Sequence, residues 1–378
     1  MFGSSLRTSG ATHQNKIHII DLCNMLLWLL IILTLLCSFI FTKTTKGIPK
    51  SWFEWKTEFR YQYLGIVGLI HDAQYASRDR VALYKQPDRI AVITGGNRGI
   101  GLRIVEKLLA CDMTVIMGVR DPRSAEDAVG GIVDLSQTKG KLICEQLDVG
   151  DMKSVRAFAQ KISQTYAKVD LLINNAGIMF APFKLTADGY ESHFAINYLG
   201  HFMLTHLLLP KLRAAGKPGR NARIVNVSSC VNLIGRINYK DLNGLKYYYP
   251  GTAYSQSKLA QILFTRHLQT LLDAEKANVQ VNVVHPGIVD TDLFEHSATT
   301  AVPFFKKLFF KTPERGSRTV VFAAIDPSIE GQGGTYLSNG GKGPFHADAK
   351  QPAKCEKFFE HSCALLKIKQ YGNGEYPL

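Results

Sequence analysis

The sequence predicts an α/β fold built on a parallel β-sheet with helices packed against it. From Asp88 onward, short apolar runs rich in β-branched residues alternate with segments of helical periodicity, which is typical of βαβ units. The first apolar run, 90–93, leads into a glycine-rich turn and then into an amphipathic segment that starts at Leu102. A chain of 378 residues, 46% of them hydrophobic, is long enough for one large domain with extensions.

Strands and helices are expected in regular alternation along 88–340, the predicted domain. Each strand is a short apolar run bounded by turn residues, and each helix has apolar residues three and four positions apart. The expected strands are 90–94, 113–118, 141–147, 169–174, 222–228, 279–285 and 333–337. The expected helices are 99–110, 151–166, 188–213, 251–275 and 314–326.

The stretch 22–42 contains no charged residue and is expected to be a single transmembrane anchor that follows a flexible N-terminus, 1–21. A helix needs about 20 apolar residues to cross the hydrocarbon core, and this stretch is long enough. A cleaved signal peptide is the alternative, but the apolar region is too long and no small-residue cleavage site follows it. Lys and Arg are more numerous on the C-terminal side, which predicts that the domain faces the cytosol.

The segments on either side of the predicted domain are expected to be a linker, 43–87, and a C-terminal extension, 341–378. The linker is rich in aromatic and basic residues. Such residues suit the headgroup zone of a membrane, and a helix packed on the domain explains them equally well. The aromatic residues are Trp52, Phe53, Trp55, Phe59, Tyr61 and Tyr63.

The formal net charge of +14 indicates anionic partners. No block of Lys and Arg is interleaved with aromatic residues, and no zinc-finger spacing occurs, so a membrane surface and a polyanionic cofactor are favoured over nucleic acid. The seven cysteines form no Cys-x-x-Cys pair and no metal-ligand spacing. Reduced thiols and no metal site are therefore expected.

The turn after the first strand has the spacing Thr94-Gly-x-x-x-Gly-x-Gly101. Glycine permits a sharp turn and a close approach of the backbone to a pyrophosphate, and the N-terminus of the next helix offers free N–H groups to phosphate. A plain strand–helix turn also uses glycine, so this turn alone proves no dinucleotide site. The residues predicted to contact a cofactor here are Thr94, Gly95, Asn97, Arg98, Gly99, Ile100 and Gly101.

An arginine, Arg120, and not an acidic residue, ends the second strand. A carboxylate at this place binds the ribose hydroxyls of NAD, whereas an arginine accommodates the 2′-phosphate of NADP. Arg98 could reach the same phosphate. NADP(H) is therefore favoured and NAD(H) is the alternative, unless Arg120 only pairs with Asp121 or contacts solvent.

The ends of the later strands carry further candidates for cofactor binding, because ligands of parallel sheets bind beyond the carboxyl ends of the strands. Small residues there let the backbone pass beneath the cofactor, and a Pro-Gly pair can turn the chain over it. Asp148 and Thr291 could instead cap helices. The candidates are Asp148, Val149, Asn175, Ala176, Gly177, Pro286, Gly287 and Thr291.

Tyr254 and Lys258 lie one helical turn apart and share a face of the helix 251–275. A nearby ammonium favours the phenolate and lowers the tyrosine pKa, which would make Tyr254 a general acid or base. Ser229 could hydrogen-bond the substrate oxygen. Asn197 could hold a water in line with Lys258, or it could simply satisfy buried backbone groups.

In order and spacing, these motifs resemble the short-chain dehydrogenase/reductase family over about 88–340. The resemblance implies a seven-stranded Rossmann sheet of order 3-2-1-4-5-6-7 with helices on both faces. It also implies a catalytic tetrad and contacts of Tyr254 and Lys258 with the cofactor. The matching elements are Thr94-x-x-x-Gly-x-Gly101, Asn174-Asn-Ala-Gly177, Asn197, Ser229, Tyr254-x-x-x-Lys258 and Pro286-Gly287.

Within the family, 197–202 and the long interval between Ser229 and Tyr254 are similar to the retinol-dehydrogenase-like branch. The segments 223–229, 255–260 and 310–313 are more similar still to branch members that act on polyprenol and dolichal in dolichol synthesis, with dual cofactor use. This resemblance implies a membrane oxidoreductase of lipophilic alcohols and aldehydes at the endoplasmic reticulum or lipid droplets. Retinol, retinal or a steroid are alternative substrates, and a non-catalytic cofactor-binding scaffold is the alternative class.

The family resemblance also implies that the helices 188–213 and 251–275 can pair two copies in a homodimer. The segment 301–311 follows the sixth strand, where such folds place a substrate lid, and it contains four Phe and three Lys. That composition indicates a segment resting on a membrane interface, or a lid helix packed on the domain.

Overall fold

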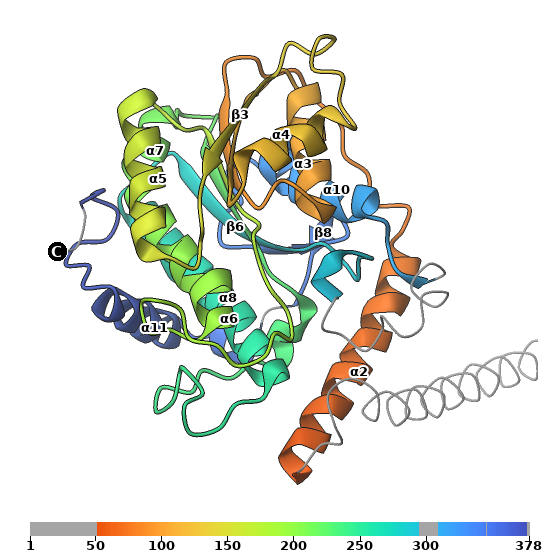
Figure 1. Ribbon diagram of the computed structural model, residues 1–378, viewed down its shortest axis with the longest axis vertical. Coiled ribbons are helices and arrows are strands. Elements are labelled where there is room, and N and C mark those ends of the chain that lie inside the picture. Colours follow the sequence, from red (N-terminus) through yellow and green to blue (C-terminus); the bar gives the residue numbers. More distant parts are fainter. Residues whose placement is uncertain (1–50, 295–308, 345, 376–378) are drawn as a thin grey trace, which may run out of the picture. The chain divides into compact units, whose positions relative to one another are not determined.

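The computed structural model describes residues 51–294, 309–344 and 346–375 (Figure 1). The chain divides into two compact units, one ending at Trp55 and the other running from Lys56 onward. The strands of the second unit are β1 (Ile90–Thr94), β2 (Thr114–Val119), β3 (Lys141–Gln146), β4 (Leu171–Asn174), β5 (Ala222–Val227), β6 (Val279–His285), β7 (Tyr336–Ser338) and β8 (Gly341–Lys342). The helices are α2 (Trp52–Gln74), α3 (Gly99–Ala110), α4 (Pro122–Gly130), α5 (Met152–Thr165), α6 (Ser192–Phe194), α7 (Gly200–Ala215), α8 (Pro250–Ala274), α10 (Pro313–Ile325) and α11 (Pro352–Leu365).

The strands form one sheet of order β3-β2-β1-β4-β5-β6-β7-β8. The pairs from β3 to β7 are parallel, so the α/β Rossmann-type topology is confirmed. The strand order reverses between β1 and β4, since β1 pairs with β2 on one side and with β4 on the other. Such a switch point leaves a crevice beyond the carboxyl ends of the two strands, where dinucleotides bind.

The expectation of seven strands was wrong by one, because β8 pairs antiparallel with β7. The two strands are joined by Asn339 and Gly340, both with positive φ. An Asn-Gly pair favours this two-residue hairpin turn, so the signal for the eighth strand was present in the sequence.

Alternate residues of the buried strands face two separate layers of core. Val92 packs on the side of α5, α7 and α8, whereas its neighbours Ala91 and Ile93 pack on the side of α3 and α10. Figure 1 shows these two groups of helices on opposite sides of the sheet. Both faces of the sheet are therefore covered, which explains why the strands read as nearly continuous apolar runs.

The expected helix 188–213 starts later and is less regular than the sequence indicated. Its first turn begins at Ser192, because the side chain of Glu191 accepts hydrogen bonds from the N–H groups of His193 and Phe194. A π-helical turn, Ala195–Leu199, then interrupts the helix before α7. Turns of this kind are rare and occur mostly at functional sites.

Two helices outside 88–340 belong to the same unit as the sheet. From Lys56 onward α2 belongs to this unit and contacts it through Tyr61 and Asp72, and α11 packs along α8. Phe358 and Phe359 of α11 are buried in the core layer of α7 and α8. The central part of α8, 254–265, is buried throughout within this chain.

The predicted anchor, 22–42, and most of the predicted lid, 301–308, lie outside the described residues. None of the helices in the part of the chain that the structure describes has the length and apolar character needed to cross a membrane.

Candidate active site

The glycine turn after β1 brings three backbone segments into close contact. A side chain on Gly101 would place its Cβ 2.1 Å from the carbonyl oxygen of Gly95 and 2.7 Å from Nδ2 of Asn175. Only glycine fits this contact between the first turn of α3 and the end of β4. Asn175 secures the turn, since its Nδ2 donates to the carbonyl oxygens of Thr94 and Gly95 at 3.0 and 2.9 Å.

Thr94 positions the turn from beneath, because its side chain is fully buried. Its hydroxyl oxygen accepts hydrogen bonds from the N–H groups of Asn175 and Ala176, both at 3.0 Å, and lies 2.9 Å from Nε2 of His201. Burial lowers the pKa of His201 to about 3, so this imidazole is neutral. The two predicted cofactor segments, 94–101 and 175–177, are thus fixed to each other through one hydroxyl group.

The N-terminus of α3 matches the requirements of a phosphate site. Its first residue follows Arg98, whose side chain forms no cap, so the N–H groups of the first turn keep no side-chain acceptor there. Thr291 lies against this turn, because a Cβ added to Gly99 would be 3.3 Å from Thr291 Cγ2. The residues therefore fit the pyrophosphate of a dinucleotide.

The two predicted 2′-phosphate ligands, Arg98 and Arg120, are both exposed. Arg98 lies 3.4 Å from Asp292, and solvent screens this exposed ion pair. Asp121, the suggested partner of Arg120, instead caps α4 by accepting from the N–H of Ser124. Asn97 is half-buried in the turn, and the partly buried Ile100 packs against the core beneath it.

The candidates after β3 and β6 differ in accessibility. Asp148 is exposed and accepts from the N–H of Gly150 at 2.9 Å, while Asp151 is the residue that caps α5. Val149 is buried in the core. After β6, Pro286 is buried and Gly287 has a φ of 93°. A Cβ on Gly287 would lie 2.7 Å from a carboxylate oxygen of Asp72, so α2 closes against the Pro-Gly turn.

Tyr254 and Lys258 lie in the first half of α8, and both are buried. Nζ of Lys258 donates to the carbonyl oxygen of Val227 at 2.9 Å and is 5.7 Å from the centre of the Tyr254 ring. Burial lowers the pKa of Lys258 to about 7. Burial also raises the pKa of Tyr254 well above its usual range, and a hydrogen bond with Ser229 opposes this shift.

Burial of Tyr254 acts against the expected lowering of its pKa by Lys258. Removing a phenolate from water is costly, and this burial has the largest influence on the Tyr254 pKa. Tyr254 therefore stays protonated at neutral pH and is ready to donate a proton. Ser229 follows β5 and its side chain hydrogen-bonds Tyr254.

Asn197 lies in the π-helical turn, and its side chain makes three hydrogen bonds, to two residues. Its Oδ1 accepts from the N–H of Ile178 at 2.8 Å, and its Nδ2 donates to the Ile178 carbonyl and to Ser257 Oγ at 3.0 and 2.9 Å. A Cβ on Gly177 would lie 3.1 Å from Asn197 Oδ1 and 3.8 Å from Lys258 Nζ. Asn197 thus joins the loop after β4 to the helix that carries Tyr254 and Lys258.

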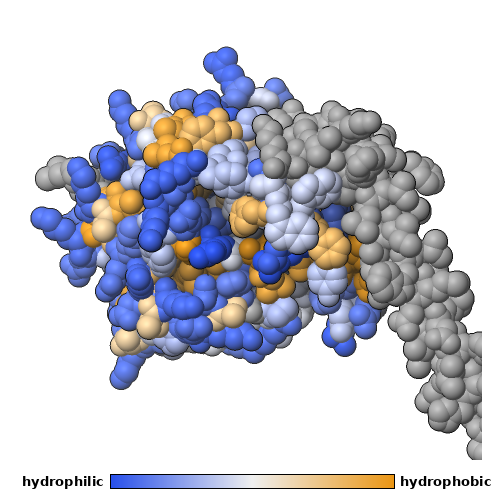
Figure 2. Space-filling view, turned by 90° about the horizontal axis from the view of Figure 1, so that it is seen from below, coloured by the Kyte–Doolittle hydropathy of each residue, from blue (hydrophilic) through white to orange (hydrophobic). Residues whose placement is uncertain are grey.

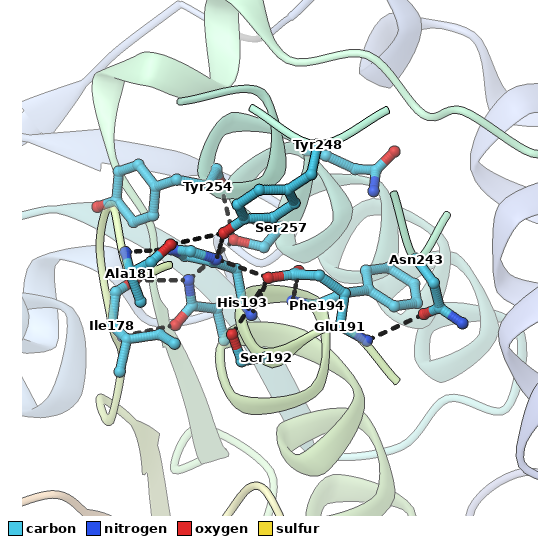
Figure 3. A network of polar contacts seen from close by, with 12 residues as sticks. Ile178, Ala181, Glu191, Ser192, His193, Phe194, Asn243, Tyr248, Tyr254 and Ser257 are labelled. Atoms are coloured by element: carbon cyan, nitrogen blue, oxygen red, sulfur yellow. Dashed lines mark hydrogen bonds and ion pairs between the residues drawn. The ribbon is translucent and has the colours of Figure 1, made fainter. Parts of the chain in front are cut away.

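A network of polar contacts holds the loop after β4 (Figure 3). Glu191 lies 2.7 Å from Nδ1 of His193, and Nε2 of His193 accepts from the N–H of Ala181 at 3.2 Å. Tyr248 donates to the carbonyl oxygen of Ala181 at 2.6 Å. Burial raises the pKa of Glu191, but the hydrogen bonds and the charge interaction with His193, together with backbone hydrogen bonds, lower it by more. The pKa of Glu191 is therefore below its usual value.

Sequence reasoning missed the part that α2 plays at the site. The hydroxyl of Tyr61 donates to the carbonyl oxygen of Gly251, and its ring centre lies 5.5 Å from that of Phe180. The Phe180 ring in turn lies 5.8 Å from Tyr254. These residues belong to an apolar cluster around Tyr254 that also contains Met179, Val231, Cys230, Ile234, Leu293 and Phe294. The only signal in the sequence was the density of aromatic residues before the domain.

A family model described as short chain dehydrogenase matches residues 89–301, the part of the chain that contains the glycine turn, Ser229, Tyr254 and Lys258. This chain belongs to the short-chain dehydrogenase family. It is therefore an oxidoreductase that uses a nicotinamide dinucleotide.

Relatives of this short-chain dehydrogenase place it in the retinol-dehydrogenase-like branch. Polyprenol dehydrogenase of Homo sapiens is 43% identical over 259 residues, which cover 67% of this chain and 78% of the relative. Retinol dehydrogenase 14 of Mus musculus is 42% identical over 265 residues, covering 66% and 78%.

Solved structures agree with the fold of this short-chain dehydrogenase. An uncharacterised protein from Mycobacterium Paratuberculosis is 34% identical and aligns with a TM-score of 0.59 over 78% of this chain and 97% of its own. The RhlG/NADP active-site complex of Pseudomonas aeruginosa is 25% identical, with a TM-score of 0.54 over 69% and 99%.

Proposed function

We propose that this short-chain dehydrogenase is a membrane-anchored, NADP(H)-preferring enzyme that interconverts polyisoprenoid alcohols and aldehydes of the polyprenol and dolichal type. The observation that carries the proposal is the surroundings of Tyr254, a proton donor enclosed by an apolar cluster that includes the rings of Tyr61, Phe180 and Phe294. An aldehyde on a long hydrocarbon chain fits such surroundings. The 43% identity to human polyprenol dehydrogenase supports the same substrate class.

In the reducing direction, Tyr254 donates its phenolic proton to the carbonyl oxygen of the substrate, and Ser229 orients that oxygen by a hydrogen bond. The bound dinucleotide supplies the hydride that completes the alcohol. Lys258, held by the Val227 carbonyl, stabilises the phenolate that Tyr254 becomes whenever Lys258 is charged. Asn197 is a positioning residue, because its three hydrogen bonds hold the loop at Ile178 against α8.

The preference for NADP(H) rests on the two exposed arginines, since neither has a buried partner that would compete for a phosphate. The Arg120→Ala variant is expected to raise KM for NADPH by roughly 10- to 100-fold and to change KM for NADH by less than about threefold, because only NADPH carries the 2′-phosphate. Initial rates with each cofactor measure this. Arg123→Ala, which removes a neighbouring exposed arginine of α4, is the control. Equal changes for both cofactors would contradict the assignment.

The membrane anchor in this proposal is the uncharged stretch 22–42, with the domain on the cytosolic side and the endoplasmic reticulum or lipid droplets as the location. The excess of basic residues after this stretch supports the orientation.

Turnover of the detergent-solubilised full chain on a substrate panel tests the proposed function. The panel contains polyprenal and dolichal, retinal, a keto-steroid and a fatty aldehyde, each with NADPH and NADH. We expect the highest kcat/KM with the polyisoprenoid aldehydes and NADPH. Retinal is the second candidate, since retinol dehydrogenase 14 of Mus musculus is 42% identical. A higher kcat/KM with retinal or the steroid would overturn the polyisoprenoid assignment.

A further inference from the structure

The outward side of α2 carries a stripe of exposed hydrophobic residues. Phe59 is 54% exposed, Tyr63 58%, Val67 42% and Ile70 49%. Their spacing of three and four residues keeps them on one face of the helix. Figure 2 shows that the molecular surface also carries hydrophobic patches among hydrophilic side chains on the side seen from below. Scattered single apolar residues are normal on a protein surface, whereas a contiguous apolar stripe indicates an interaction site.

The opposite side of the same helix packs on the substrate side of the active site. At about 100° per residue, Tyr61, Gly68 and Asp72 fall opposite the exposed stripe. Tyr61 donates to Gly251 at the start of α8, and a Cβ added to Gly68 would touch the Ile288 side chain at 3.0 Å. Asp72 accepts from the N–H of Ile288 at 2.8 Å. The exposed stripe is therefore not a core face that the fold has left uncovered.

The C-terminal end of α2 is held by buried charges. The carboxylate of Asp72 lies 3.5 Å from Nζ of Lys311, and Asp79 lies 3.0 Å from the same nitrogen. Asn339, in the turn between β7 and β8, also donates to Asp72 at 3.0 Å. These buried contacts fix the rotation of α2 about its axis, and therefore keep the hydrophobic stripe on the outward side of the helix.

Three features of the stripe match a lipid surface. Lys56 and Arg60 are exposed on the same side of the helix, and basic residues beside apolar ones favour anionic headgroups. Phe59 and Tyr63 are aromatic, the residue type enriched at membrane–water interfaces. The uncharged stretch 22–42 ends nine residues before Ser51. A helix so close to a membrane anchor can lie on the bilayer but is not apolar enough to cross it.

We propose that α2 docks on an anionic bilayer surface through Phe59, Tyr63, Val67 and Ile70, and so holds the substrate side of the active site at the membrane. The proposal rests on the proposed membrane-anchored function and deepens it. A long lipophilic substrate would then pass from the bilayer along α2 to the apolar cluster around Tyr254 without entering water.

The test places a single tryptophan on the stripe of the full chain. The three native tryptophans are replaced by phenylalanine, and Val67→Trp is compared with Leu135→Trp, an equally exposed position (42% and 41%) in the loop after α4. Both proteins are reconstituted in phosphatidylcholine–phosphatidylserine vesicles whose acyl chains carry bromine, a contact quencher of tryptophan. We expect the tryptophan at 67 to lose at least about half its emission and that at 135 less than about one tenth. Only a side chain that inserts into the bilayer reaches the brominated acyl chains.

Flotation of the same vesicles separates this proposal from the proposed function. If the protein floats with the vesicles but the tryptophan at 67 is not quenched, the anchor stands and the docking of α2 is overturned. A blue-shifted but unquenched emission at 67 would show that the stripe is covered by protein and not by lipid, either by a second copy or by the segment 295–308. This result would also overturn the proposed docking. Quenching in a protein that turns over no lipophilic aldehyde would support docking while the proposed function fails.

A charge variant gives a second, independent readout. Phe59→Glu combined with Val67→Glu is expected to raise KM for a bilayer-embedded polyisoprenoid aldehyde by about tenfold or more, because anionic side chains oppose contact with acidic lipid. Its kcat/KM for a short water-soluble aldehyde is expected to remain within about twofold, since neither residue touches the active site. An equal loss on both substrates would overturn the proposal.

Discussion

Replacing Tyr254 by phenylalanine is expected to lower kcat by about three orders of magnitude or more, because the variant has no phenolic proton to donate to the substrate oxygen. Burial raises the pKa of Tyr254, so at neutral pH the hydroxyl carries the proton that the reduced product needs. The ring of the variant keeps its contact with Phe180, whose centre lies 5.8 Å away, so the apolar cluster should remain packed. Single-turnover rates of aldehyde reduction measure the loss.

Cofactor affinity distinguishes a lost proton donor from a damaged site. We expect Kd for NADPH to change by less than about threefold in Tyr254→Phe, because the glycine turn and both arginines are untouched. Tyr248→Phe is the matched control, since this variant also loses a tyrosine hydroxyl, one that makes a partly buried hydrogen bond to the Ala181 carbonyl. The control should keep turnover within about tenfold. Retained turnover in Tyr254→Phe would refute its role as the acid.

Replacing Lys258 by methionine is expected to lower kcat by about two orders of magnitude or more and also to change how stability depends on pH. The pKa of Lys258 falls from 10.5 to about 7 because burial disfavours the ammonium. Between these two values the unfolded chain binds a proton that the folded chain does not bind. The free energy of unfolding therefore rises with pH across this window and falls again as pH drops toward 7.

Lys258→Met removes this dependence, since methionine does not titrate. The variant should be more stable than the natural protein at pH 7, by at most about 5 kcal/mol, and the difference should shrink as the pH approaches 10. Thermal unfolding of the cofactor-free full chain in detergent, at pH 7 and pH 9.5, measures this. Lys161→Met, which removes an exposed lysine, is the control. A constant difference at both pH values would show that burial of Lys258 does not shift its protonation.

Local signals were sufficient for most of the sheet and for the helices between the strands. The helix α3 and the strand β6 have the bounds that the periodicity predicted, 99–110 and 279–285. Two helices were missed although proline begins each of them, Pro122 in α4 and Pro352 in α11. Proline is favoured in the first turn of a helix, but short or weakly periodic segments do not stand out from loops.

The identity of the catalytic residues could be predicted, but their protonation could not. The spacing of Tyr254 and Lys258 follows from helix geometry alone. Their pKa values depend on the depth at which α8 is buried, and that depth is set by the elements packed on it, among them α6 and α11, which are distant in sequence. The role of Asn197 likewise needed the π-helical turn, which aims its amide at Ile178.

The sequence by itself determined the alternation of strands and helices, the glycine turn and the Tyr254–Lys258 pair, because each depends on residues close together in the chain. Only the tertiary structure placed Tyr61 and Asp72 of α2 against the active site, since their partners, Gly251 and Ile288, lie more than a hundred residues further along the chain. Which face of an aromatic helix is buried depends on those distant partners. The outward stripe of α2 could therefore be recognised only from the structure, which shows that the opposite face of the helix is packed against the domain.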